Sequence, residues 1–269
     1  MSCKFSVVTI SFNQAQYLRA AMESVLTQDG VEIEYIVCDP GSDDGSREII
    51  ENYGDPRIIP VFEKDAGPAD GLNKGFAHAT GDIYCYINSD DLFLPGAFAK
   101  AAAYLRKHPE VDVATGHALV VDGEGETIRR VWSEPFSRKA VAHGAHIQIQ
   151  PSTFFRAEAF KRTPGFDVED RANWDGSLLT TMYLAGARFG IIDEFLSCYR
   201  LHGESITMSG RLAERHHQNA MLNFERLMGR PYRDSDRFAG KLLKLAKHVR
   251  WPLRTLERIR KGPLFKFSG

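Results

Sequence analysis

The sequence predicts an α/β fold with a mostly parallel central sheet and a helical extension at its C-terminal end. Over residues 1–115, short β-branched segments alternate with segments whose apolar residues recur at helical spacing. Strands that alternate with helices normally pair in parallel. Acidic residues follow three of these strands, and loops at the carboxyl ends of parallel strands are where such sheets bind ligands. The sequence therefore predicts a ligand site at one edge of the sheet.

The first half of the chain contains four expected strands and at least three expected helices. We expect the strands at residues 5–10, 35–38, 57–62 and 83–87. We expect the helices at residues 17–28, 68–79 and 95–108, the last with a proline at its start. We also expect Ser42 to cap a helix, because Asp43 and Asp44 would then lie in its first turn, where the helix dipole favours negative charge.

The second half is less regular. The segment "ALVVDGEGETIRRVW" predicts a β-hairpin, because two β-rich runs flank the turn residues 122–125. We expect a strand at residues 151–155 and then a short helix. A longer helix should begin in "NWDGSLL" and end at Gly186, and a last strand should cover residues 195–200.

The tail changes in composition. From Arg237 onward ten residues are basic, and only Glu257 is acidic. One face of the expected helix would carry Phe238, Leu242, Leu245 and Val249. A helix of this kind can lie in the headgroup layer of an anionic membrane, or it can pack on its own domain with a solvated basic side. The sequence leaves both interpretations open.

Composition narrows the class of protein. With 34 basic and 35 acidic residues the net charge is -1, so no overall positive field would attract nucleic acid. The four cysteines form no Cys-x-x-Cys pair, which favours free thiols in a reducing compartment over a disulfide or metal framework. We recognise no signal peptide and no apolar stretch long enough to span a bilayer, and we expect a cytoplasmic protein.

The segment "INSDD" ends the fourth expected strand with two adjacent carboxylates, Asp90 and Asp91. Two adjacent carboxylates repel each other unless a cation or a hydrogen-bond donor stabilises them. The sequence lacks Gly-x-x-x-x-Gly-Lys-Ser/Thr, and no Gly-x-Gly-x-x-Gly follows the first strand. A bound nucleotide would therefore need a divalent cation, Mg²⁺ or Mn²⁺, to balance its phosphates. The alternative is a solvated turn in which Asp91 caps the following helix.

Five motifs, in this order, resemble glycosyltransferase family 2, the inverting enzymes with a GT-A fold that include bacterial surface-polysaccharide glycosyltransferases. The motifs are "VVTISFN", "YIVCDPGSDDGS", "DAGPADGLNKG", "ATGDIYCYINSDD" and "LSCYRLHGESIT", and the resemblance covers residues 5–207. It implies a GT-A domain over residues 1–210, with a donor-binding half to about residue 115 and an acceptor-binding half from there on. Residues 211–269 would then be a basic, amphipathic helical extension.

The resemblance implies a nucleoside site at the ends of the first three strands. Phe12 would lie against the base, Asp39 would accept a hydrogen bond from it, and Asp65 would belong to the same wall. Pro40 stands where many family members have Asp or Gly, so the base, typically uracil in the family, is left open.

The resemblance also implies a phosphate site. Asp90 would approach the ribose and share the cation, and Asp91 would hold the metal-bound diphosphate, while Asn88 stands where an acid is common. Arg200 could pair with a phosphate through two hydrogen bonds. His202 could ligate the metal, the alternative being a structural role.

The general base of the family lies in an acidic motif at a helix start, and the matching stretch is "RANWDGSLL". Asn173 cannot take a proton, so we assign the base to Asp175. Glu169 and Asp170 are the alternatives, and Asp175 could instead serve as a helix cap.

The segment "IQIQPSTFFR" resembles a family region on the acceptor side, which makes Gln150 and Ser152 possible sugar contacts. Trp174 could stack on a sugar ring, although a core position is the simpler interpretation. We assign no role to the other histidines, including His143, His146, His216 and His217.

The resemblance carried by these motifs implies an inverting glycosyltransferase that uses a nucleotide-diphosphate sugar donor. In the family this donor is typically UDP-linked, and the acceptor would be a saccharide or a lipid-linked molecule. A peripheral contact with an anionic membrane through residues 237–269 is one of the two interpretations left open above, and we expect no nucleic-acid partner. One alternative is a nucleotide-sugar-binding module that has lost catalysis. The other is a nucleotidyltransferase, which normally has a glycine-rich, arginine-containing loop after the first strand; "TISFNQAQYL" has none.

Overall fold

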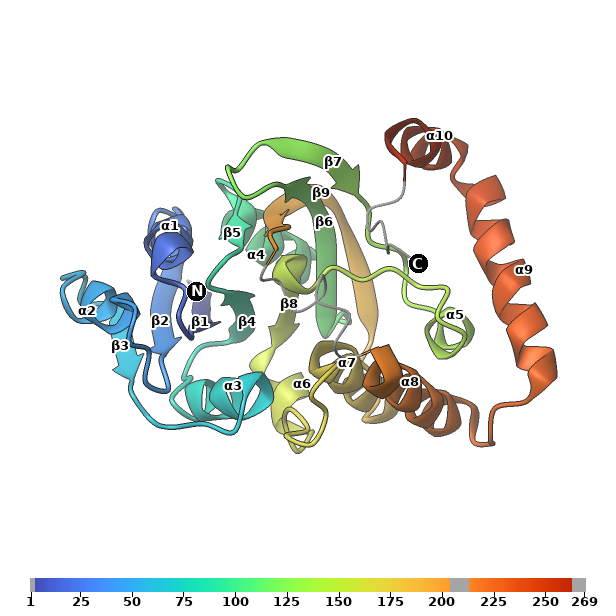
Figure 1. Cartoon of the computed structure of the whole chain (residues 1–269), viewed down its shortest axis with the longest axis horizontal. Coiled ribbons are helices and arrows are strands. Elements are labelled where there is room, and N and C mark those ends of the chain that lie inside the picture. Colours follow the sequence, from blue (N-terminus) through green and yellow to red (C-terminus); the bar gives the residue numbers. More distant parts are fainter. Residues whose placement is uncertain (1–2, 204–212, 263–269) are drawn as a thin grey trace.

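The computed structural model describes residues 3–203 and 213–262, and these residues form an α/β fold around one sheet (Figure 1). The strands are β1 (Lys4–Ile10), β2 (Glu32–Cys38), β3 (Ile58–Val61), β4 (Ile83–Asn88), β5 (Leu92–Phe93), β6 (Val113–Val121), β7 (Thr127–Val131), β8 (Thr153–Arg156) and β9 (Phe189–Arg200). The helices are α1 (Ala15–Leu26), α2 (Ser46–Glu51), α3 (Pro68–Ala77), α4 (Ala97–Lys107), α5 (Arg138–Ala142), the 3₁₀ turn η1 (Gln150–Ser152), α6 (Ala157–Lys161), α7 (Trp174–Leu184), α8 (Ala213–Met228), α9 (Asp234–Arg250) and α10 (Pro252–Lys261).

The strand order is β3-β2-β1-β4-β8-β6-β9-β5, with β7 beside β6. The first four strands of this order pair only in parallel with one another, which confirms the prediction for the first half of the chain. Ile10, at the end of β1, lies opposite Cys38 of β2 on one side and Asn88 of β4 on the other. Adjacent strands are about 4.8 Å apart, so the segments that follow β2 and β4 begin about 10 Å from each other.

Both faces of the sheet are buried. Phe5 and Val7 of β1 belong to one core cluster, and Val8 belongs to the other, because alternate residues of a strand point to opposite faces. The first cluster draws on α1 and α4, and the second draws on α3, α6 and α7. This two-sided burial explains why the predicted strands are nearly continuous apolar runs.

The second half holds the expected hairpin of β6 and β7, and it also holds two features that the sequence did not indicate. Strand β9 begins at Phe189 rather than at residue 195, and it pairs in parallel with β6. Strand β5 has two residues, Leu92 and Phe93, which pair with the far end of β9. Two residues carry no periodic signal, so this contact could not be predicted from local pattern.

The expectation that Ser42 caps a helix was wrong. Helix α2 begins at Ser46, after Gly45, whose φ of +96° few residues other than glycine adopt readily. The backbone N–H of Ser42 instead donates to Asp39 (2.8 Å), and the Ser42 hydroxyl accepts from the N–H of Asn13 (2.9 Å). Ser42 therefore ties two loops together at the carboxyl edge of the sheet.

The C-terminal helices pack beside the sheet domain (Figure 1). Phe224 and Leu227 of α8 form a small core with Ala142 of α5. In Figure 1, α9 stands at one side of the molecule and leads from α8 to α10. The proposed boundary at residues 210–211 stays a prediction. Within residues 3–203 and 213–262, no helix combines the length and apolar character needed to cross a bilayer.

Glu34 of β2 connects three segments at the opposite edge of the sheet. Its carboxylate pairs with the ammonium of Lys4 (2.6 Å) and accepts from the hydroxyl of Ser6 (2.5 Å), the backbone N–H and hydroxyl of Thr80, and the N–H of Gly81. Burial opposes ionisation, but the hydrogen bonds from Lys4, Ser6 and Thr80 lower the pKa of Glu34 from 4.5 to about 2. The ionised form of Glu34 is therefore bound more tightly in the folded chain than in the unfolded one.

We predict that Glu34→Gln lowers the free energy of unfolding by about 2 kcal/mol at neutral pH, because the amide loses the ion pair and cannot accept from every donor. A carboxyl group with a depressed folded pKa stabilises the fold above its unfolded pKa and loses this contribution as the pH falls through the folded value. Urea unfolding should therefore show that the wild type loses more stability than the variant between pH 4.5 and about 2.

The matched control is Glu32→Gln, because Glu32 is exposed on the same strand. It should leave the free energy of unfolding unchanged within about 0.5 kcal/mol. Equal effects of the two substitutions would contradict the role given to Glu34.

Candidate active site

The loop after β1 lies between the ends of β2 and β4 and presents Phe12 to solvent, with 60% of the side chain exposed. The next residue, Asn13, has a φ of +53°, an uncommon conformation for a residue other than glycine. Its backbone N–H donates to Ser42, and its side-chain oxygen accepts from the N–H of Asp43 (3.1 Å). The loop is thus held in a bent form that leaves the Phe12 ring available as a stacking surface.

Asp39 and Asp65 lie near each other on the same edge. Asp39 is 1% exposed; one oxygen accepts from the N–H groups of Gly41 (2.9 Å) and Ser42 (2.8 Å), and the other, Oδ2, has no partner among the described residues. Burial raises the pKa of Asp65, and the negative charges of Asp70 and Asp39 add to the rise. The structure therefore brings together the two acids that we predicted to share a wall.

Asp90 and Asp91 point in different directions, although they are adjacent. The Asp90 carboxylate is partly exposed, and its Oδ2 lies 3.0 Å from Nε2 of His202. Asp91 is 1% exposed and accepts from the backbone N–H of Arg200 (2.9 Å), while its Oδ2 has no partner among the described residues. Burial and the neighbouring Asp90 raise the pKa of Asp91 well above its usual value. Asp90, rather than Asp91, faces the open side of the turn.

Arg200 ends β9 and is 7% exposed. Its Nε donates to the carbonyl of Asp90 (2.9 Å), and its Nη1 donates to the carbonyls of Asp122 (3.1 Å) and Gly123 (2.9 Å). The guanidinium also lies over the ring of Tyr17, 4.9 Å from its centroid. We revise the expectation that Arg200 pairs with a phosphate, because these contacts hold its side chain inside the protein as a brace for the Asp90–Asp91 turn.

Four buried polar atoms at this edge have no hydrogen-bond partner among the described residues: Ser11 Oγ, Gln14 Oε1, Asp39 Oδ2 and Asp91 Oδ2. Native proteins pair most buried polar groups, so a cluster of unpaired ones indicates a place that water or a ligand completes. Three of the four follow β1 or β2 directly or within a few residues, and the fourth follows β4. The edge is therefore a candidate binding site.

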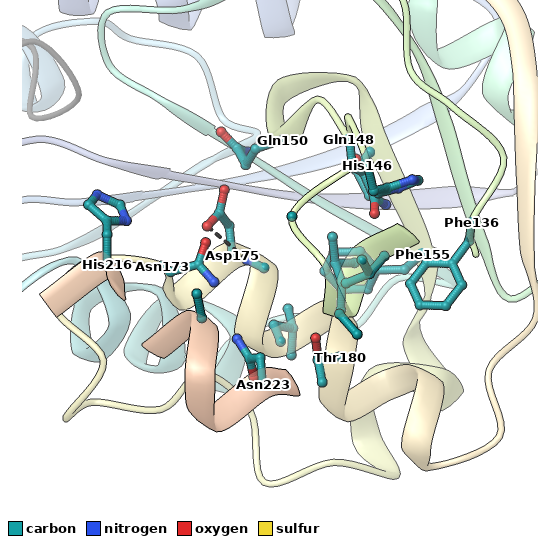
Figure 2. A pocket seen from close by; sticks show the side chains of 18 of the residues that line it. Phe136, His146, Gln148, Gln150, Phe155, Asn173, Asp175, Thr180, His216 and Asn223 are labelled. Carbon is teal, nitrogen blue, oxygen red and sulfur yellow. Dashed lines mark hydrogen bonds between the residues drawn. The ribbon is translucent and has the colours of Figure 1, made fainter. Parts of the chain in front are cut away.

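Asp175 lies in the first turn of α7, beside a cavity of about 340 Å³ (Figure 2). One oxygen accepts from the N–H of Gly176 (2.8 Å). Burial raises the pKa of Asp175 and Asp170 adds to the rise, while the Gly176 N–H and the nearby His216 oppose it. A carboxylate with a raised pKa is a better proton acceptor than one with the ordinary value.

The two alternative acids have other roles. Asp170 accepts from the N–H groups of Ala172 (3.1 Å) and Asn173 (2.7 Å), from the hydroxyl of Ser177 and from the amide of Asn219. It therefore secures the start of α7, and Glu169 is exposed to solvent. Of the three acids, Asp175 is the one that lines the cavity.

The three residues that we predicted to contact the acceptor have different positions in the structure. Gln150 lines the cavity, and its amide donates to the carbonyl of Tyr86 on β4 (2.7 Å), so the cavity borders the end of that strand. The expectation that Ser152 contacts a sugar was wrong, because Ser152 is fully buried and hydrogen-bonded to His117 and Ser197. Trp174 packs against the second core cluster, as the simpler interpretation held.

Sequence reasoning missed most residues of this cavity, including three polar ones that matter for its chemistry. His146, Thr180 and His216 all line it, and Figure 2 shows them arranged around Asp175 and Gln150. They lie on three separate segments, and no local motif connects them. Apolar and polar residues are mixed around α7, so periodicity gives no signal that Thr180 is buried.

Known proteins match both the sequence and the fold. Residues 6–163 match the model of the family described as glycosyl transferase family 2. An uncharacterized glycosyltransferase of Nostoc sp. is 28% identical over 222 residues, which are 78% of this chain and 68% of that protein. A Bacillus subtilis protein, TuaG, provisionally named as a teichuronic acid biosynthesis glycosyltransferase, is 31% identical over 118 residues, which are 43% of this chain and 47% of that protein.

Two solved structures share the architecture. Staphylococcus aureus TarS in complex with UDP-GlcNAc has a TM-score of 0.68 at 18% identity, covering 92% of this chain and 73% of that one. The mannosyltransferase PcManGT from Pyrobaculum calidifontis, solved with GDP-Man and Mn²⁺, has a TM-score of 0.63 at 19% identity, covering 98% of this chain and 77% of that one. These likenesses confirm the predicted GT-A type of fold.

Proposed function

The chain belongs to glycosyltransferase family 2, and from that premise we propose that it transfers a sugar, with inversion, from a UDP-linked donor to a saccharide or lipid-linked acceptor. The observation that carries the proposal is the position of the unpaired carboxylate oxygens of Asp39 and Asp91, which lie at one edge of the sheet. The cavity beside Asp175 opens next to the end of the strand that leads to Asp91. Such an arrangement can hold a donor and an acceptor side by side.

The nucleoside occupies the edge formed by β1, β2 and β3. The exposed ring of Phe12 offers a stacking surface, and the free oxygen of Asp39 can accept a hydrogen bond from a base N–H. Asp65 closes the same wall. TarS was solved with UDP-GlcNAc, a donor of the proposed kind.

Asp90 and His202 are the residues that fit a divalent cation. Their facing atoms are 3.0 Å apart, a carboxylate oxygen and an imidazole nitrogen, which together suit Mn²⁺ or Mg²⁺. Residues 3–203 and 213–262 contain no group of three or more Asp, Glu, His and Cys placed for a metal. A two-residue site matches a cation that completes its coordination with diphosphate oxygens and water. When bound, such a cation would offset negative charge on the leaving diphosphate.

Asp91 supports this site from behind, in a revision of its predicted role as the direct metal ligand. Its buried carboxylate holds the N–H of Arg200, which fixes the turn that carries Asp90. Asn88 ends β4 at the same turn, and its carbonyl accepts from the N–H of Asp91 (3.2 Å). Its side chain can still accept a hydrogen bond from the donor.

The reaction is a single displacement at the anomeric carbon. The acceptor hydroxyl forms the new bond on the side opposite the diphosphate, the bond to the diphosphate breaks, and the configuration inverts. Asp175 accepts the hydroxyl proton, because it is the half-buried acid that borders the cavity and its pKa is raised.

We predict that Asp175→Asn lowers kcat by about 100-fold or more, because the amide cannot accept the proton. UDP should still raise the melting temperature of the variant as it does for the wild type. The wild-type rate should fall as the pH drops through a pKa above the ordinary aspartate value, and this acidic limb should be missing from the residual rate of the variant. Release of UDP from a panel of UDP-sugars in the presence of acceptor extracts measures the rate.

The matched control is Glu169→Gln, because Glu169 is an exposed acid of the same loop. It should keep wild-type kcat. Turnover by Asp175→Asn at the wild-type rate would remove Asp175 as the base, and UDP binding without release by the wild type would favour an inert binding module.

We predict that Asp90→Asn weakens Mn²⁺ binding in the presence of UDP by about tenfold or more, because a neutral amide replaces the charged ligand. Electron paramagnetic resonance of free Mn²⁺ reports binding without reference to activity. Asp29→Asn, which changes an exposed acid between α1 and β2, should bind Mn²⁺ as the wild type does. Unchanged Mn²⁺ binding by Asp90→Asn would contradict the assignment.

We further propose that α9 and α10 contact an anionic membrane surface, which would place the enzyme at the inner face of the cell membrane. Helix α9 docks through one face, where Gly240 lies against His143, the residue after α5, and Lys247 pairs with Glu134 (3.0 Å). On the opposite face lie apolar side chains that are 50–76% exposed: Phe238, Leu242, Leu245 and Val249.

The exposed apolar stripe continues onto α10 with Leu253, Leu256 and Ile259. Exposed basic residues flank it: Arg237, Lys241, Lys244 and Arg250. An amphipathic helix with apolar side chains facing outward and a basic border has the chemistry that anionic headgroups bind.

We predict that Leu242→Glu together with Val249→Glu reduces flotation with anionic liposomes several-fold, because the substitutions remove apolar contact and add negative charge. Wild-type protein should float with phosphatidylglycerol vesicles and not with phosphatidylcholine vesicles. Leu222→Glu on α8 is the control, since Leu222 is similarly exposed outside the stripe. Equal flotation of all three proteins would exclude the stripe as a membrane contact.

A further inference from the structure

The cavity beside Asp175 has polar atoms that the protein itself does not satisfy. Both ring nitrogens of His146 and the hydroxyl of Thr180 are buried and make no hydrogen bond of good geometry with the described residues, although the Gln148 side chain lies close enough to the His146 ring to act on it. His146 lies on the segment between α5 and η1, and Thr180 lies five residues beyond Asp175 on α7, which is about 7 Å along the helix axis. Figure 2 shows His146 and Thr180 on the same side of Asp175.

These atoms form a group distinct from the donor edge. The described residues contain seven buried side-chain atoms without a partner: four follow β1, β2 or β4, and the other three are those of His146 and Thr180. Buried hydroxyl and imidazole groups are normally hydrogen-bonded, so these three atoms indicate that water or a ligand occupies the cavity. A neutral imidazole offers one donor and one acceptor, as does a threonine hydroxyl, and this set matches a hydroxyl or amide group of a ligand.

The cavity carries little charge. Among the described residues that line it, none is Lys or Arg, and only Asp175 and His216 are titratable apart from His146 and Tyr86. Burial lowers the pKa of His146 to about 4, so its ring is neutral at physiological pH. The ammonium of Lys247, whose charge also lowers the pKa of His146, is bound to Glu134 (3.0 Å). A carboxylate or phosphate that entered this cavity would lose its hydration, find no lysine or arginine in the lining and meet the negative charge of Asp175.

The remaining lining suits the apolar face of a sugar ring. Phe136, Phe155, Leu178 and Leu179 contribute apolar surface around the polar atoms. The volume of about 340 Å³ lies at the lower end of the range of about 300–1,000 Å³ for small-ligand pockets. The cavity therefore has room for a small unit of the acceptor rather than for a long stretch of polymer.

We propose that this cavity selects an uncharged acceptor sugar, with His146 and Thr180 hydrogen-bonding its hydroxyl or amide groups and determining specificity. The inference rests on the proposed function and deepens it, since it names the class of acceptor. It excludes uronic acids and phosphorylated sugars as the unit that enters the cavity.

The test compares matched neutral and acidic sugars. The probes are nitrophenyl glucoside and galactoside, the corresponding glucuronide and galacturonide, and nitrophenyl N-acetylglucosaminide. Binding to the full chain in the presence of UDP and Mn²⁺ is measured by saturation-transfer nuclear magnetic resonance. At least one neutral sugar should bind, and any uronide should bind about tenfold or more weakly than its neutral partner.

Two variants test the specificity residues. His146→Leu and Thr180→Val remove the polar atoms with little change of size, and each should weaken binding of the neutral sugar about three- to tenfold. Acceptor KM should rise in the same proportion. The control Thr27→Val removes an exposed hydroxyl of α1 outside the cavity and should change neither quantity.

The proposal is overturned if a uronide binds as tightly as its neutral partner, if no neutral sugar binds, or if both variants bind as the wild type does. Release of UDP from UDP-sugars in the same preparation reports the proposed function separately. If UDP is released but neutral sugars and uronides bind equally well, only the proposed class of acceptor is overturned. Discrimination without release from any nucleotide sugar supports the cavity assignment and overturns the transfer reaction.

Discussion

The contact between the end of β9 and the turn after β4 holds the two halves of the site together. The backbone N–H of Arg200 donates to the buried carboxylate of Asp91, and the guanidinium of the same residue donates to the carbonyl of Asp90. Further hydrogen bonds reach Asp122 and Gly123 in the hairpin. One arginine thus links the parallel strands of the first half to the mixed strands of the second. The orientation of Asp90, and with it the pairing of Asp90 with His202, depends on this link.

The site departs from ordinary protein packing in one consistent way, since its buried polar atoms lack protein partners. A buried group left unpaired costs about 1–3 kcal/mol, so the fold tolerates such groups only where the surrounding structure is strongly stabilised. Here both faces of the sheet are packed, and the unpaired atoms lie at the carboxyl edge of the sheet and in the cavity beside Asp175. Ligand binding would satisfy these atoms, which gives a physical reason for affinity at both places.

Much of the fold could be predicted from the sequence because the signals are local. The buried strands, the helix that begins near Asp175 and the hairpin follow from periodicity and turn residues, and Asp39 and Asp65 meet because both follow parallel strands. The roles of Asp91 and Arg200 could not be predicted in this way. Neighbouring residues on a turn can face opposite directions, and whether a guanidinium faces solvent or backbone carbonyls depends on a hairpin turn more than 75 residues away in the sequence.

The sequence by itself determined the α/β class, the acids at one edge of the sheet and the amphipathic character of the tail, because each of these follows from neighbours along the chain. Only the tertiary structure decided which acid faces outward, that His146 and Thr180 border one cavity, and that α9 docks by the face opposite Phe238. The physical reason is that burial and hydrogen-bond satisfaction depend on segments distant in the chain. Whether a side chain is buried, and whether its polar atoms are hydrogen-bonded, is decided only when those segments pack together.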